Sequence, residues 1–150
     1  MRRLSATGAL SSLAFLFGFS LVGLSAWVVA GFHATPPQGE AFGAGLAYFG
    51  TYALGGVGVA GIGFALVISP ARADGGGLLT VGRRQRQLSG AGLSVLVASL
   101  VAPVVAIQVT GIVNTILTFL GLVATGTLLV AVALLWTVSE AVLIRAGVVD

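Results

Sequence analysis

A glycine-rich run near the middle of the chain has a spacing that is used to bind nucleotides. Residues 56–61 read GVGVAG, the G-x-G-x-x-G pattern that cradles a dinucleotide pyrophosphate between a strand and a helix. Asp74 follows 18 residues after Gly56, close to where such folds place a ribose-binding acid. The run therefore raises the question of a cofactor.

The surrounding sequence indicates a membrane helix instead. A chain with 23 glycines in 150 residues produces this spacing by chance, and a dinucleotide fold also needs a buried strand before the glycines and several further amphipathic elements. The run lies inside an uncharged stretch, residues 41–71, and Pro70 would break the helix that has to follow. We expect no cofactor.

The other groups capable of chemistry are few. Placing an ionisable side chain deep in a membrane costs free energy, so a residue of this kind marks a functional site by default. Glu140 is the nearest case, but it lies five residues before Arg145, where we expect a solvated or locally paired carboxylate. His33 is the only histidine and there is no cysteine, so one chain offers no ligand set for zinc or haem. We predict no metal site and no enzyme activity.

The composition excludes an ordinary soluble domain. The chain is 57% hydrophobic and 7% charged, with a mean hydropathy of +1.11, whereas soluble domains are about 25% charged. Its isoelectric point near 10.7 comes from seven basic residues, all arginine, against four acids. With so few charged residues, we interpret the basic ones as determinants of membrane orientation and not as a nucleic-acid-binding surface. We treat residues 1–150 as a single transmembrane domain.

Long uncharged stretches predict four membrane-spanning helices. Residues 4–32, 41–71 and 87–139 carry no charge over 29, 31 and 53 positions. A bilayer core needs about 20 apolar helical residues, so the third stretch holds two spans, with a tight turn at 110–114. We place the spans near 10–32, 42–69, 88–108 and 115–143. The predicted fold is an all-α integral membrane protein, a four-transmembrane-helix bundle built as two tandem helical hairpins.

The arginines predict the orientation, because all of them fall on one side of such a protein. They are Arg2, Arg3, Arg72, Arg83, Arg84, Arg86 and Arg145. The positive-inside rule puts both termini and residues 70–87 in the cytoplasm and residues 33–40 outside the cell membrane. An alternative with three spans would export Arg145.

The N-terminus also resembles a secretory signal. It begins with Met1 and two arginines, and residues 28–30 would serve as a small-residue cleavage site. The apolar run over 10–32 is longer than the roughly 7–15 residues of a signal core, so we expect an uncleaved anchor.

Small residues on the second span predict close helix packing. In lipid no hydrophobic effect drives helices together, and small side chains let the backbones of two helices come close enough to attract each other. They form two stripes at three- and four-residue steps. We predict packing contacts at Gly50, Gly56, Gly58, Ala60, Gly61 and Gly63. Thr118, Gly121 and Thr125 form a further small stripe on the fourth span. A coding bias toward glycine and alanine is the alternative explanation.

The segment 71–87 is expected to be a loop, first glycine-rich and then basic. Arginines beside a membrane hold anionic lipid headgroups with about 1 kcal/mol each. We predict such contacts for Arg72, Arg83, Arg84 and Arg86. The alternative is that these arginines only determine topology.

The sequence offers no evident catalytic site, and its helices carry faces of small residues. We therefore predict a structural or accessory membrane subunit that acts through helix packing. Its expected partners are the lipid bilayer and either further copies of itself or a membrane-protein complex. An oligomeric small channel or transporter is the alternative. A weak similarity between residues 4–11 and 88–94 would relate the two hairpins as a repeat of the kind found in transport proteins. Chance similarity is the alternative explanation, because Leu, Ala, Gly and Ser are so frequent in this chain. A lipid-acting enzyme lacks an evident acid, base or metal ligand.

Overall fold

The computed structural model describes residues 6–37, 41–70 and 81–147. Within these residues there are four helices: α1 (Ala6–Ala34), α2 (Ala41–Ile68), α3 (Arg83–Thr110) and α4 (Ile112–Arg145). Each contains an apolar segment of at least 23 residues, more than the roughly 20 needed to cross a bilayer core. The prediction of four long apolar helices is confirmed, and these helices suit a multi-pass membrane protein.

Two predicted boundaries are corrected at the ends of α3. This helix begins at Arg83 and not near residue 88, so Arg83, Arg84 and Arg86 are helical and do not lie in a loop. Gly111 alone separates α3 from α4, in place of a turn over 110–114. Its φ of 78° lies in the left-handed region that glycine adopts without a Cβ clash.

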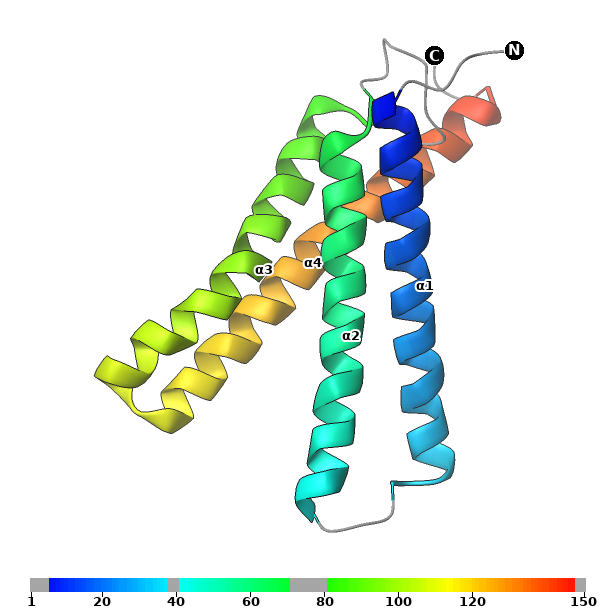
Figure 1. Cartoon of the computed structure of the whole chain (residues 1–150). Helices are drawn as coiled ribbons and strands as arrows, with labels where there is room; N and C mark the ends of the chain where they lie inside the picture. The colour runs from blue at the N-terminus through cyan, green and yellow to red at the C-terminus, as the bar shows by residue number, and fades with distance from the viewer. Residues whose placement is uncertain (1–5, 38–40, 71–80, 148–150) are drawn as a thin grey trace.

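The four helices form two antiparallel hairpins, α1 with α2 and α3 with α4 (Figure 1). The two hairpins are joined through α2, which contacts both α3 and α4. Among the described residues, α1 packs against α2 only. The buried residues of α1 are all glycine or serine, namely Gly8, Ser11, Gly18 and Ser25, so this helix approaches α2 through small side chains.

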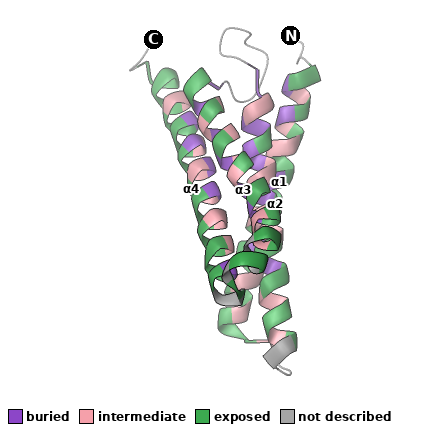
Figure 2. Cartoon of the chain, turned by 90° about the vertical axis from the view of Figure 1, so that its left-hand side faces the viewer, coloured by how far each residue is buried: buried purple, intermediate pink, exposed green. Residues whose placement is uncertain are grey.

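The hairpins meet at one end and diverge toward the other (Figure 1). We call the first the junction end; it carries the last turn of α2, the first turn of α3, the start of α1 and the end of α4. The second is the open end, which carries the two hairpin turns. Figure 2 shows that buried residues gather toward the junction end, while exposed residues predominate on the open-end halves of α3 and α4.

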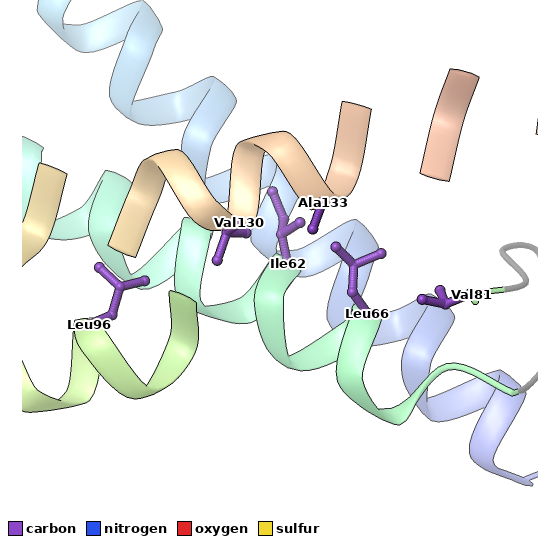
Figure 3. Packing of buried hydrophobic residues seen from close by; sticks show 6 residues of the cluster. All are labelled: Ile62, Leu66, Val81, Leu96, Val130 and Ala133. Atoms are coloured by element: carbon purple, nitrogen blue, oxygen red, sulfur yellow. The ribbon is translucent and has the colours of Figure 1, made fainter. Parts of the chain in front are cut away.

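The apolar core lies between α2, α3 and α4 (Figure 3). Its buried members are Ile62, Leu66, Val81, Leu96, Val130 and Ala133. No residue of α1 belongs to this buried set, although Phe15 and Val22 pack against it. The core therefore holds the second hairpin onto α2, whereas α1 depends on its own contact with α2.

Candidate functional site

A reciprocal contact between two glycines holds α1 against α2. A Cβ atom on Gly18 would lie 2.6 Å from the carbonyl oxygen of Gly58, and one on Gly58 would lie 2.7 Å from the carbonyl oxygen of Gly18. A Cβ on Gly61, one turn along α2, would lie 3.3 Å from the Cα of Gly18. Toward the open end, Ser25 Oγ donates a hydrogen bond of 2.8 Å to the Thr51 carbonyl. The two backbones therefore touch where side chains are absent.

The other predicted packing residues of α2 have different surroundings. Gly63 faces the second hairpin, where a Cβ would lie 3.1 Å from Cγ2 of Val130, and Ala60 packs against the apolar core. Gly50 and Gly56 have no neighbouring atom within 4 Å of the place where a Cβ would stand. Whether a glycine of α2 is in close contact therefore depends on its helix face, because a Cβ on Gly55, next to the open Gly56, would lie 2.8 Å from Oγ of Ser25.

The second hairpin contains a glycine contact that sequence reasoning missed. A Cβ on Gly92 would lie 2.9 Å from the carbonyl oxygen of Gly126, and one on Gly126 would lie 2.7 Å from Cγ of Leu96. The predicted stripe of Thr118, Gly121 and Thr125 is exposed instead. Successive residues turn about 100° around a helix, so Gly126 lies on a different face from Thr125. Within this chain, the stripe of α4 is therefore free for contact with other molecules.

Buried polar side chains gather at the junction end between α2, α3 and α4, and we call this group the polar cluster. Its members are Ser69, Gln85, Arg86, Ser89, Thr137 and Glu140. Ser69, Gln85 and Thr137 are each 2% exposed and Ser89 is 0% exposed, while Arg86 and Glu140 are half-buried. Burial of polar groups is costly unless they are hydrogen-bonded, so their partners determine how the hairpins join.

Gln85 links the start of α3 to α4. Its Oε1 accepts a hydrogen bond of 2.6 Å from the backbone N–H of Gly82, and its Nε2 donates to Oε2 of Glu140. The first of these bonds satisfies an N–H at the point where α3 begins. Sequence reasoning placed Glu140 in solvent or beside a local partner. The structure places its carboxylate half-buried against a side chain 55 positions away.

Arg86 links α3 to the end of α2, because its Nη2 donates a hydrogen bond of 2.6 Å to the Ser69 carbonyl oxygen. Arg83 and Arg84 are exposed on the first turn of the same helix. Arg72 lies outside the described residues. The predicted lipid-contacting arginines therefore do not form one group: two are exposed and one takes part in the polar cluster.

Sequence reasoning missed Gln85 and Ser89 because it assigned the first to a loop and gave the second no partner. The spacing that finds them runs along α3. Its buried residues recur at steps of four and three as Gln85, Ser89, Gly92, Leu96 and Ser99, all but Leu96 polar or small. Such steps trace one helical face. That face contacts α4 and carries Gln85 and Ser89 of the polar cluster as well as Gly92 of the glycine contact.

Other candidate groups are not brought together. Within residues 6–37, 41–70 and 81–147, no three of the His, Asp or Glu residues are close enough to hold a metal ion. His33 is exposed at the end of α1, with Nδ1 2.9 Å from the Val29 carbonyl oxygen. The run at 56–61 lies wholly inside α2, and Asp74 is outside the described residues.

No protein-family model, curated protein or solved structure matches this chain. The glycine contacts and the polar cluster are therefore the features from which a function can be inferred. Both hold helices together.

Proposed function

We propose that the protein is a structural or accessory subunit of the cell membrane that acts through helix packing and has no catalytic chemistry of its own. The observation that carries this proposal is the divergence of the two hairpins. At the open end, large apolar side chains on the facing sides of α2 and α3 stay largely exposed among the described residues. Phe49 and Tyr52 of α2 are 63% and 61% exposed, and Leu100 and Val104 of α3 are 72% and 65% exposed.

These exposed residues continue faces that are already in contact. On α2, Phe49, Tyr52 and Gly56 lie at helical steps from Gly63, which packs on α4. On α3, Val97, Leu100 and Val104 lie at steps of four and three from Leu93, whose Cβ is 3.9 Å from the Cβ position of Gly63. A partner helix seated between the hairpins would extend one continuous interface.

Open glycine positions support association with another protein. Gly50, Gly56 and Gly121 have free space where a Cβ would stand, and a helix can dock closely at such positions. We propose a homo-oligomer or a larger membrane-protein complex, with both termini in the cytoplasm. Arg83, Arg84 and Arg145 lie at the junction end, which agrees with a cytoplasmic location for that end.

Cysteine substitution tests the proposed interface directly, because the natural chain has no cysteine. Gly56→Cys, Thr118→Cys and Leu13→Cys each introduce one thiol at a different helix face. Oxidation in native membranes should give crosslinked products for Gly56→Cys or Thr118→Cys. It should give little for Leu13→Cys, because Leu13 is 66% exposed but lies on α1, outside the proposed interface. Equal crosslinking at all positions, or at none, would exclude self-association through these faces.

An oligomeric channel or transporter is the second candidate, because the hairpins are closed at one end and separated at the other. The facing side chains at the open end are mainly apolar, as Leu100 and Val104 show. Apolar side chains suit a helix or lipid better than a hydrated solute. Flux measurements distinguish the two candidates.

A further inference from the structure

Two aromatic side chains with polar groups mark one level of the first hairpin, toward the open end. Trp27 of α1 is 73% exposed, and Tyr48 of α2 is half-buried against Phe32, with ring centroids 4.9 Å apart. Within the part of the chain that the structure describes, neither the indole N–H of Trp27 nor the hydroxyl of Tyr48 makes a hydrogen bond. Such rings combine an apolar body with a group that needs a polar partner. Both requirements are met at the boundary between hydrocarbon and lipid headgroups.

The length of helix between these rings and the junction end matches the thickness of a bilayer core. Residues 6–27 of α1 and residues 48–68 of α2 each form a helical segment about 30 Å long, at about 1.5 Å per residue. The hydrocarbon core of a bilayer is also about 30 Å thick. When the two rings lie at one boundary of the core, the junction ends of α1 and α2 therefore lie at the other.

Trp136 of α4, the only other tryptophan, lies toward that second boundary. It is 45% exposed and precedes the half-buried Glu140 by about one helical turn. The exposed Arg83 and Arg84 begin α3 at the same end. Tryptophan and tyrosine are enriched at both surfaces of a membrane, and the two tryptophans of this chain lie toward opposite ends of the fold.

Both helices of the first hairpin continue past Trp27 and Tyr48. Residues 28–34 of α1 and 41–47 of α2 add about 10 Å to each helix. His33 lies exposed in the first of these segments. In the same direction, α3 and α4 stop short of the ends of α1 and α2 (Figure 1). The two hairpins therefore do not reach the same level at the open end.

We propose that Trp27 and Tyr48 form an aromatic belt that binds the lipid headgroup region at the open end. The segments beyond the belt, 28–34 and 41–47, then project past the hydrocarbon core by about 10 Å. This proposal rests on the membrane location proposed above and not on association with a partner.

The depth of Trp27 in a bilayer tests the belt. Trp136→Phe leaves Trp27 as the only tryptophan, and its fluorescence is measured in liposomes whose lipids carry bromine at chosen acyl positions. Bromine quenches an indole that lies close to it. We expect a larger loss of Trp27 fluorescence with bromine beside the headgroup than with bromine at the acyl end.

Phe17→Trp, in a chain that also carries Trp27→Phe and Trp136→Phe, is the matched control. Phe17 is 62% exposed and lies about midway along residues 6–27, so its replacement should be quenched most by the deep bromine. Deep quenching of Trp27, or none while Phe17→Trp is quenched, would overturn the belt alone. Absence of quenching at both positions would overturn the membrane location and the belt with it.

Single cysteines test the projection of the first hairpin, because the natural chain has none. His33→Cys lies in the projecting segment, and Phe17→Cys lies within the core. A charged, water-soluble maleimide added to opened vesicles reaches both membrane surfaces and should modify His33→Cys while sparing Phe17→Cys. Equal modification of the two, or protection of His33→Cys, would contradict the projection.

Discussion

Gly18 and Gly58 lie so close together that the backbone of each occupies the space where the other would carry a Cβ atom. Because α1 packs against no other described helix, its position depends on its contacts with α2, which include this glycine pair, the Ser25–Thr51 hydrogen bond and the edge-on contact of Phe32 with Tyr48. At this point the first hairpin has no space for larger side chains.

Gly58→Leu should loosen this hairpin, because the new side chain would meet the backbone of Gly18 and Cγ2 of Val22, 2.8 Å from the added Cβ. Overpacking of this kind costs about 1–3 kcal/mol. Thermal unfolding in detergent measures the loss. Gly43→Leu is the matched control, with the same chemical change in open space on the same helix and outside the proposed interface. Unchanged stability in both variants would refute close contact at Gly58.

Gln85→Ala should weaken the junction between the hairpins. The substitution leaves the Glu140 carboxylate and the Gly82 N–H without the partners that Gln85 supplies, at a cost of about 1–3 kcal/mol. Gln87→Ala changes an exposed glutamine on the same turn and should have little effect. Chemical or thermal unfolding in detergent compares the two variants. Equal stabilities would mean that the Gln85 hydrogen bonds do not hold the junction.

The sequence predicts the helices well because charge is so rare in the chain. Each uncharged stretch has only one way to satisfy its backbone in lipid, so the number and approximate bounds of the helices follow. The glycine steps on α2 also indicate a face for close contact. They do not identify Gly18 as the partner, because α1 has further glycines at Gly23 and Gly31, which have open surroundings.

The polar cluster could not be predicted in the same way. Gln85 and Glu140 meet only because α3 and α4 pack as a hairpin with a single-residue turn at Gly111, which brings positions 55 apart together. Arg86 follows two arginines that are exposed, and nothing in its type distinguishes it from them. The relative angle of the hairpins depends on tertiary packing and has no local sequence signal.

Reporter fusions test the proposed topology, which rests on all seven arginines lying on one side. Fusions after Pro37, after Gly77, near Asn114 and at Asp150 should report outside, inside, outside and inside, since arginine-rich segments stay in the cytoplasm. An external C-terminus would exclude the arrangement with four spans and both termini inside.

Replacing the exposed pair Arg83 and Arg84 by glutamine should weaken retention of anionic lipid by about 1 kcal/mol per arginine. Native mass spectrometry of the purified protein with anionic and zwitterionic lipids measures this retention. Binding of the zwitterionic lipid should not change, and added salt should reduce the difference between the two lipids. Equal retention of anionic lipid by the natural and substituted proteins would leave these arginines with a topological role only.

The central proposal is that the protein associates with itself or with other membrane proteins and does not transport solutes. Two measurements test it together, the size of the assembly and the flux of ions and solutes. The size of the protein is determined in native membranes or nanodiscs, and ion and solute flux is measured in liposomes that contain the purified protein alone. At 15.0 kDa, with hairpins that leave large apolar faces exposed, the chain should be found as an oligomer or within a larger complex and should give no selective flux. A lone monomer with robust, selective flux would contradict the account and establish a transporter instead.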